Sequence, residues 1–286
     1  MTPTDIVIVN YNAGALLADG VRALLADDAA DLRVTVVDNA STDTSLSALP
    51  ADPRLAVIRN PANLGFAAAC NIGAAAGRAE TLLFLNPDCR MEPPALASLQ
   101  AALCSGEAIG MVGGLLLNPD GTEQPGGRRD IPTPENLMGR FLGGRRGGAD
   151  DYSRTGDPLP AGPIDIPVIS GALMMVKRAA FDAVGGWDEG YFLHVEDIDL
   201  CVRFGRAGYR ILFVPGARVM HVKGASSRGR PVFVEWHKHR GMLRFFRKFM
   251  AADRAPPTMA LVTIAVWLRF SALATVLTAR RLLGRG

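Results

Sequence analysis

Four short apolar segments in the first third of the chain each end at polar residues, and this repeated pattern most restricts the possible fold. The segments are residues 5–10, 32–39, 55–60 and 81–86. Helix-like stretches over about 13–26 and 66–76 lie between them. Apolar strands that alternate with helices are typical of a parallel sheet covered on both faces. The sequence therefore predicts an α/β fold with a Rossmann-like first half.

Polar residues follow three of these strands directly. They are Asn10-Tyr11-Asn12, Asp38-Asn39 and Asn86-Pro87-Asp88. Ligands of open parallel sheets bind beyond the carboxyl ends of the strands, so we expect these residues to share one rim. Asp88 there would suit a divalent cation that holds a diphosphate, because Mg²⁺ takes few protein ligands. A turn or a helix cap explains an Asn-Pro-Asp sequence equally well.

The middle of the chain changes character twice. A helix over about 93–105 and a strand over 109–118 continue the alternation, and then residues 119–163 become rich in Gly, Pro and Arg. This composition predicts a long mobile loop. Its arginines would cover an anionic donor, touch lipid phosphate, or have no role. They are Arg128, Arg129, Arg145 and Arg146. Regular structure is expected again from 164 to 215.

The last part of the chain differs from the rest in charge. Residues 1–217 carry 17 Lys and Arg against 26 Asp and Glu, whereas residues 218–286 carry 14 against 2. Residues 236–250 predict a basic amphipathic helix with aromatics on its apolar face. Residues 259–279 are apolar but contain Arg269, which costs about 2.5 to 3.5 kcal/mol at the centre of a bilayer. We expect helices that lie on an anionic membrane or dip into it; packing on the globule is the alternative.

Other features exclude some classes of protein. The four cysteines lack a CxxC spacing, and residues 1–5 lead directly into a strand without a signal peptide, as in a reduced cytosolic chain. A nucleic-acid partner for the basic tail is not favoured, because the aromatics lie with Met and Leu and no stacking groove is evident.

Five motifs in order resemble the family 2 inverting glycosyltransferases, most closely their rhamnosyltransferase-like branch. They are IVIVNYN (6–12), VVDNASTD (36–43), NPANLGFAAACNIG (60–73), LFLNPDC (83–89) and the run from SGALMMVKR to VMH (170–221). The resemblance covers about residues 5–250. It implies a GT-A fold, with a Rossmann-like nucleotide-binding half, an acceptor-binding half and a mixed central sheet. A C-terminal amphipathic and apolar helical extension would follow.

The resemblance assigns the nucleotide-sugar donor to the first half. Asp38 would accept the imide N–H of the base, which suits uracil or thymine, and Asn10 and Tyr11 would line the base pocket. An Asx turn competes for Asn39. The remaining donor-binding residues by this resemblance are Asn39, Arg59, Asn63, Gly65, Asn71 and Asn86. Gly65 could instead end a helix.

The resemblance also implies a divalent cation, Mg²⁺ or Mn²⁺. Asp88 and His221 would be its ligands, and an imidazole favours Mn²⁺. Many GT-A enzymes have an Asp-x-Asp motif at this strand end, but Asn86 occupies the first position here, so whether the metal is essential stays open. A hydrogen-bonded structural histidine is the alternative for His221.

Catalytic and acceptor roles fall on the second half. The family pattern places the base on Asp197, with Glu196 and Asp199 orienting the first turn of a helix, where acids also complement the helix dipole. The acceptor-binding residues by this resemblance are Ser170, Gly171, Trp187, Asp188 and Glu196. A tight strand entry for Ser170 and Gly171, and a core position for Trp187, are the alternatives.

Together these features predict a metal-assisted enzyme that moves L-rhamnose from a dTDP donor to a lipid-linked or cell-envelope polysaccharide at the cytoplasmic face of the membrane. Another sugar, such as galactofuranose from a UDP donor, and a binding module without activity are the alternatives. The expected organisation is a donor half (1–118), a loop (119–163), an acceptor and catalytic half (164–232) and membrane-associating helices (233–286).

Overall fold

The computed structural model describes residues 2–26, 31–134, 152–222, 224 and 229–283. Within this part of the chain a nine-stranded sheet forms the centre and a two-stranded sheet lies beside it. The strands are β1 (Thr4–Asn10), β2 (Leu32–Asp38), β3 (Leu55–Arg59), β4 (Thr81–Leu85), β5 (Cys89–Met91), β6 (Ile109–Leu117), β7 (Arg128–Arg129), β8 (Ile164–Asp165), β9 (Val168–Ile169), β10 (Leu173–Lys177) and β11 (Arg210–His221). The helices are α1 (Ala15–Leu25), η1 (Ser45–Ala48), α2 (Phe66–Ala75), α3 (Ala95–Cys104), α5 (Arg178–Ala183), α6 (Glu196–Arg206), α7 (Pro231–Phe249) and α8 (Pro256–Leu282).

The large sheet is mixed, as the resemblance to the glycosyltransferases implies. Its strand order is β3-β2-β1-β4-β10-β6-β11-β5, with β8 paired to β11. Strands β1 to β4 pair in parallel and form the Rossmann-like half. β10 lies antiparallel between β4 and β6, and β6 pairs in parallel with β11. The carboxyl ends of β1, β2 and β4 therefore lie at one edge, where the polar rim was expected.

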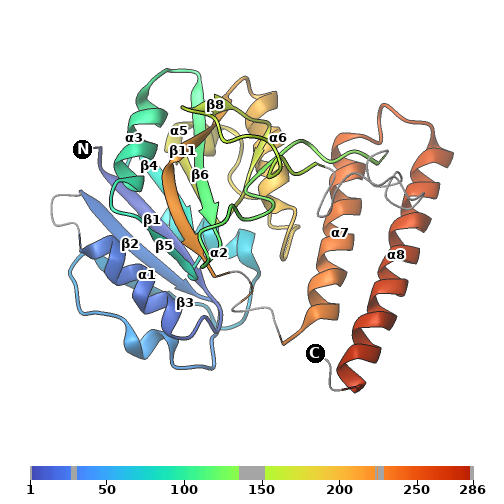
Figure 1. Ribbon diagram of the computed structural model, residues 1–286, viewed down its shortest axis with the longest axis horizontal. Coiled ribbons are helices and arrows are strands. Elements are labelled where there is room, and N and C mark those ends of the chain that lie inside the picture. The colour runs from blue at the N-terminus through green and yellow to red at the C-terminus, as the bar shows by residue number, and fades with distance from the viewer. Residues whose placement is uncertain (1, 27–30, 135–151, 223, 225–228, 284–286) are drawn as a thin grey trace.

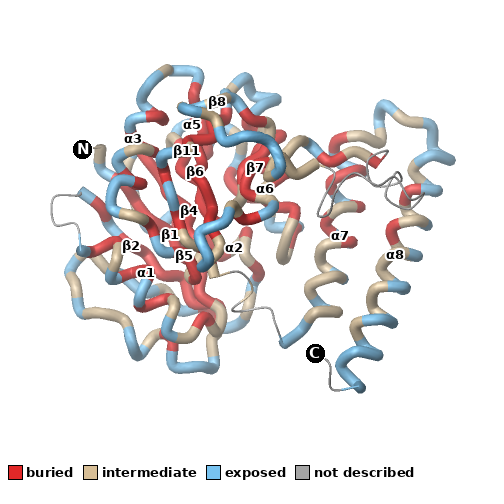
Figure 2. The backbone as a smooth tube through the Cα atoms, in the orientation of Figure 1, coloured by how far each residue is buried: buried red, intermediate tan, exposed pale blue. Residues whose placement is uncertain are grey.

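Each face of the sheet supports its own apolar core, because successive side chains of a strand point to opposite faces. Ile6 and Ile8 pack with α1 and α3 on one face. Val7 and Val9 pack with α2, α5 and α6 on the other. Figure 2 shows the strands as the most continuously buried part of the molecule. The sheet is thus a rigid platform for the residues at its edge.

Part of the expected mobile loop is held in place. Arg128 is buried, and its Nε donates to Glu123 Oε1 at 2.7 Å. Arg129 is in β7, which pairs with β9. The composition predicted a loop but could not indicate that a buried guanidinium would fix it. Residues 135–151, with Arg145 and Arg146, lie outside the described residues.

The C-terminal helices form a pair beside the sheet, with α8 outermost (Figure 1). The apolar face of α7 packs on the globule, since Leu243 and Phe246 are buried. α8 contributes Val262 and Val266 to the same core and leaves other apolar residues exposed. Its exposed large apolar residues are Leu261, Ile264, Leu268, Val276 and Leu282. α8 is long and apolar enough to cross a membrane by length and composition alone. The apolar face of α7 and one side of α8 thus pack on the globule, as the alternative to a membrane location predicts.

Candidate functional site

One cavity of about 610 Å³ lies beyond the carboxyl ends of the strands and extends to α7 and α8. Of the residues expected at the site, its walls include Tyr11, Asn39, Asn63, Gly65, Asn86, Asp88, Ser170, Gly171, Glu196, Asp197 and His221. Donor, metal and catalytic residues inferred from separate motifs are therefore neighbours around one space. Arg59, Asn71, Trp187 and Asp188 are not among the lining residues.

The ends of β1 and β2 are joined by a buried polar network. Asn10 Nδ2 donates to Asp38 Oδ1 at 2.8 Å and to Ser45 Oγ at 2.8 Å, and Ser41 N donates to Asp38 Oδ2 at 3.2 Å. Asn10 and Asp38 line this network rather than the cavity, whereas Tyr11 lines the cavity itself. The carboxylate of Asp38 thus already has protein partners that fix its orientation.

A second chain of amides supports the rim behind this network. Asn60 Nδ2 donates to Asn39 Oδ1 at 2.8 Å, and Asn39 Nδ2 donates to the carbonyl of Gly65 at 3.0 Å. Gly65 has φ +91°, and a Cβ there would lie 2.7 Å from the carbonyl oxygen of Phe192. Only glycine combines this backbone conformation with so close a contact. Gly65 thus begins α2 and shapes the cavity wall.

Two residues expected at the donor lie elsewhere. Arg59 is exposed at the end of the edge strand β3. Asn71 holds the loop around Trp187, because its Nδ2 donates to the Trp187 carbonyl at 3.0 Å and its Oδ1 accepts from Trp187 N at 2.9 Å. A donor role for either residue stays a prediction, and the observed contacts of Asn71 are structural.

Asp88 and His221 meet at the end of β4 and of β11. Asp88 Oδ1 lies 3.1 Å from His221 Nε2, and both residues are buried. His221 Nδ1 lies 2.6 Å from Gln124 Oε1, and Gln124 Nε2 donates to the His221 carbonyl and to Asn118. Because these two bonds fix the amide orientation, Gln124 Oε1 must accept from Nδ1–H. In a neutral His221 the Nε2 lone pair then faces the carboxylate.

This arrangement fits a cation. Two acceptor atoms 3.1 Å apart repel one another unless a proton or a metal ion lies between them. The ligand atoms of Asp88, Cys89 and His221 all lie within 4.8 Å of one another. A carboxylate and an imidazole suit Mn²⁺ and Mg²⁺ with open positions for phosphate and water. Burial and the nearby Asp88 charge raise the pKa of Cys89 well above its usual value. Cys89 is therefore a weaker candidate ligand than Asp88 and His221, because metals bind the thiolate.

Sequence reasoning missed Gln124. It lies 97 residues before His221, within the part of the chain expected to be a mobile loop. No local pattern marks it, since only the folded chain brings its amide to the imidazole. Partners that orient a ligating histidine belong to a metal site as much as the ligands do.

The acids of the HVEDIDLC run begin α6 at the cavity. Two non-glycine residues before them, His194 and Val195, have left-handed backbones with φ +65° and +74°. Strained backbone of this kind persists only where the surroundings impose it, and it is frequent at active sites. It directs Glu196 and Asp197 toward the cavity, while Asp199 is buried and pairs with Arg203 at 2.6 Å. The contacts of Asp199 are thus structural, and its expected role in orienting the first turn stays a prediction.

Asp197 is held as a carboxylate. Arg129 Nη2 and the backbone N–H of Gly171 donate to its Oδ2 at 2.5 and 3.1 Å, and the backbone N–H of Ile198 donates to its Oδ1 at 2.8 Å. Burial alone would raise the pKa of Asp197, but Arg129 and these hydrogen bonds outweigh it and lower the pKa. The sequence left Arg129 in a loop that would cover the donor, touch lipid phosphate or have no role, and the structure shows it in contact with Asp197.

Glu196 behaves in the opposite way. Burial, and then the charge of Asp197, raises the pKa of Glu196 to about 8. Its Oε2 has no hydrogen-bond partner among the described residues. The surroundings therefore move the pKa values of two adjacent acids in opposite directions, which favours the ionised form of Asp197 and the protonated form of Glu196. Such a split is typical of acid and base pairs in active sites.

The expected acceptor residues divide into two groups. Ser170 and Gly171 line the cavity, and a Cβ at Gly171 would approach the Asp197 side chain to 3.2 Å. Trp187 is only 2% exposed and packs edge to face against Phe84 at 5.1 Å, which matches the core alternative. Asp188 pairs with Arg244 and Lys248 of α7 at 2.8 and 2.6 Å, so it fastens α7 to the globule.

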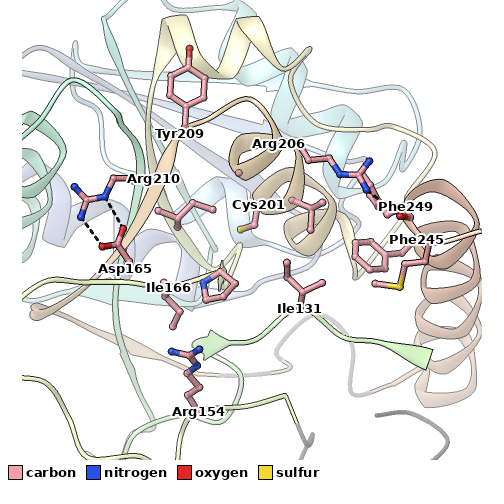
Figure 3. A pocket seen from close by; sticks show the side chains of 15 residues that line it. Ile131, Arg154, Asp165, Ile166, Cys201, Arg206, Tyr209, Arg210, Phe245 and Phe249 are labelled. Carbon is pink, nitrogen blue, oxygen red and sulfur yellow. Dashed lines mark hydrogen bonds and ion pairs between the residues drawn. The ribbon is translucent and has the colours of Figure 1, made fainter. Parts of the chain in front are cut away.

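A second hollow lies on the far side of α6, between α6, α7 and the strands β8 and β11 (Figure 3). Cys201 and Phe245 form part of its wall, and Asp165 pairs with Arg210 at its rim. The acids and the histidine that converge in the first cavity are not among its described lining residues. The cavity at the strand ends is therefore the candidate functional site.

Comparisons with known proteins agree with this geometry. Residues 5–185 match the model of Glycosyl transferase family 2, and residues 160–240 match Glycosyltransferase like family 2. The chain is 32% identical over 240 residues to the N-acetylglucosaminyl-diphospho-decaprenol L-rhamnosyltransferase of Mycobacterium tuberculosis, covering 79% of this chain and 77% of the relative. It is 35% identical over 88 residues to Rhamnosyltransferase WbbL of Escherichia coli K12, covering 30% of this chain and 33% of the relative.

A solved structure shares the fold. The mannosyltransferase PcManGT from Pyrobaculum calidifontis, in complex with GDP-Man and Mn²⁺, superimposes with a TM-score of 0.61 at 18% identity and covers 97% of this chain and 75% of its own. The mixed sheet with its parallel first half is the GT-A fold. The chain is a glycosyltransferase that belongs to family 2.

Proposed function

We propose that this enzyme transfers L-rhamnose from dTDP-rhamnose to a lipid-linked saccharide by a single displacement with inversion. The observation that carries the proposal is one cavity lined by Asp88, His221 and Asp197, which unites a cation site with an ionised carboxylate. The names of two relatives support rhamnose as the sugar, and one of these names also supports an acceptor in which N-acetylglucosamine is joined to a lipid through a diphosphate.

In the proposed complex the nucleotide lies over the ends of β1 and β2. Tyr11 and Asn39 face the cavity there, and Asn10 and Asp38 form the network behind them. Asp88 and His221 would hold a divalent cation, which would supply positive charge to stabilise the leaving diphosphate. Gln124 would hold His221 with Nε2 toward that cation.

Asp197 is the proposed base. The acceptor hydroxyl oxygen forms a bond to the anomeric carbon, the bond from that carbon to the diphosphate breaks, and the hydroxyl proton passes to an oxygen of Asp197. The contact with Arg129 lowers the proton affinity of Asp197 in the free enzyme. Displacement of this contact by the acceptor would restore basicity, and the small residue Gly171 leaves room beside the carboxylate.

The proposed location is the cytoplasmic face of the membrane, where the exposed apolar residues of α8 would enter one leaflet. Leu261, Ile264 and Leu268 lie on this exposed side, and the last 69 residues carry the excess of basic side chains. Apolar burial and attraction to anionic lipids together give stable attachment. Flotation with anionic vesicles should recover the whole chain, and the double variant Leu261→Gln and Leu268→Gln should stay with the soluble fraction.

The proposed organisation of the chain follows from these roles. Residues 1–118 would bind the donor and residues 164–232 would bind the acceptor. Residues 119–163 would join these halves and supply Arg129 and Gln124 to the cavity. Residues 233–286 would attach the enzyme to the membrane.

The deciding experiment measures release of nucleoside diphosphate from dTDP-, UDP- and GDP-sugars, with the lipid-linked acceptor and with Mn²⁺, Mg²⁺ or EDTA. We expect metal-dependent release from dTDP-rhamnose that is lost in Asp88→Ala and Asp197→Asn but kept in Asp182→Asn, which changes an exposed acid outside the cavity. Release from UDP-galactofuranose instead would identify that compound as the donor and refute dTDP-rhamnose. Donor binding without release from any donor would favour a binding module that lacks activity.

A further inference from the structure

Arg269 occupies an unusual position in α8. The helix spans 27 residues, and its other charged residues, Arg280 and Arg281, lie in its last turn. Arg269 is near the middle, is half-buried, and lines the cavity on the side where α7 and α8 meet. A charge in the middle of an apolar helix at a membrane is costly and usually marks a binding function.

The surroundings of Arg269 do not neutralise it. Its Nη1 donates to His239 Nε2 at 2.8 Å, and His239 Nδ1 lies 2.6 Å from the Glu235 carbonyl. Burial lowers the pKa of His239, and the charge of Arg269 lowers it further, so the imidazole is a neutral acceptor. Among the described residues no carboxylate forms an ion pair with Arg269. The other guanidinium N–H groups have no hydrogen-bond partner among the described residues, so they can meet an anion in the cavity.

Other cations line the same cavity. Lys238 lies next to His239 on α7 and pairs with Glu235 at 3.0 Å, and Arg230 lies at the start of α7. Around His239 two positive side chains, Arg269 and Lys238, therefore accompany one negative side chain, Glu235. At the other end, Asp88 and Asp197 are negative and suit a cation and a hydroxyl.

Part of the cavity wall on α7 and α8 is apolar. Met242 and Val266 line the cavity beside Arg269, and Phe233 is 40% exposed at its rim. On the outer side of the same helix Leu268 is 65% exposed. An anionic group at Arg269 would thus have the catalytic acids on one side and an apolar path toward the membrane on the other.

We propose that Arg269, together with Lys238, binds the diphosphate of the lipid-linked acceptor, whose hydrocarbon chain leaves along α8. This subsite rests on the proposed function. A guanidinium recognises phosphate oxygens through two parallel hydrogen bonds, which an ammonium cannot reproduce. The leaving diphosphate of the donor belongs to the cation site at Asp88 and His221. The cationic end of the cavity therefore serves a second diphosphate.

The test compares two acceptors that carry the same N-acetylglucosamine. One carries it on a short-chain prenyl diphosphate and the other on an alkyl group without phosphate. Wild type should have the higher kcat/KM for the diphosphate acceptor, and Arg269→Gln should lower the ratio of the two kcat/KM values by roughly tenfold or more. The ratio for Arg269→Lys should lie between the ratios for wild type and for Arg269→Gln. Arg280→Gln, which removes the same charge from the same helix outside the cavity, should keep the wild-type ratio.

Other outcomes would overturn the subsite. An equal loss with both acceptors would make Arg269 structural. A rise in the KM for the donor would assign the residue to the leaving diphosphate, and an equal effect of Arg280→Gln in vesicles would assign it to phospholipid headgroups. Calorimetric titration of the full chain with the short-chain prenyl diphosphate acceptor, without donor, separates this proposal from the proposed function. Weaker binding in Arg269→Gln supports the subsite even if no sugar is transferred, and unchanged binding refutes it.

Discussion

The two polar clusters at the edge of the sheet differ in what their side chains contact. At β1 and β2, Asn10 and Asp38 hydrogen-bond to each other and to serines within a buried network. At β4 and α6, Asp88 and Asp197 line the cavity. Both clusters follow apolar strands or begin a helix, and both look alike in the sequence. The cluster of Asn10 and Asp38 supports the cavity wall, whereas Asp88 and Asp197 can contact a ligand in the cavity.

This difference predicts separate consequences for substitution. Residues of the first cluster should affect the free energy of unfolding, because their partners would be left buried and unpaired. Residues of the second should affect catalysis or metal binding with less effect on folding.

The largest effect is expected for Asp197→Asn. The amide keeps an acceptor for Arg129 but cannot take a proton, so kcat should fall by roughly 10² to 10⁴, the usual contribution of a general base. Donor affinity should stay near that of wild type. Single-turnover kinetics and a donor titration measure both, and a variant with normal kcat would remove Asp197 from the mechanism.

Asp38→Ala tests the first cluster, where we expect an effect on stability. The change leaves the backbone N–H of Ser41 unpaired and removes one acceptor from buried Asn10, so we expect a loss of about 2 to 4 kcal/mol in the free energy of unfolding. Asp88→Ala is the matched change at the second cluster. Urea denaturation of both variants would contradict the distinction if the two losses were equal.

Glu196→Gln should alter how stability depends on pH. The pKa of Glu196 is about 8 in the folded chain, against its ordinary value of 4.5. The unfolded chain therefore releases this proton first as pH rises, and wild type loses stability between about pH 4.5 and 8. The amide of the variant does not ionise, so the variant should gain on wild type by about 1.4 kcal/mol for each pH unit across this interval. Thermal unfolding at pH 5, 7 and 9 checks the sign, and a constant difference would refute the raised pKa.

Gln124→Met should have the smallest of these effects. Without the amide, His221 loses the acceptor that keeps Nε2 toward Asp88, and Mn²⁺ affinity should fall by roughly tenfold. Gln100→Met is a suitable control, because Gln100 is also buried but its Nε2 donates to Thr2 and Thr4 far from the cavity. Electron paramagnetic resonance of Mn²⁺ gives both affinities. Equal affinities in the two variants would remove Gln124 from the site.

Sequence reasoning was most successful where a residue's place follows from chain direction. The ends of β2 and β4 had to lie on one edge once the strands were parallel, and this placed Asp38 and Asp88. It was less informative where a side chain can either line the site or pack inside the protein. Trp187 and Asn71 pack on each other's loop, and Gln124 meets His221 only because β11 returns to the turn after β6. Such contacts depend on tertiary packing, which strand patterns do not encode.

The position of β10 has a consequence for how the chain is made. β4 ends at Leu85 and β6 ends at Leu117, but β10 (Leu173–Lys177), which pairs with both, is synthesised later. A ribosome would release the whole donor half with an unpaired strand at its edge, and unpaired edges readily join other chains. Synthesis of the acceptor half closes that gap. The two halves should therefore complete folding as one cooperative unit.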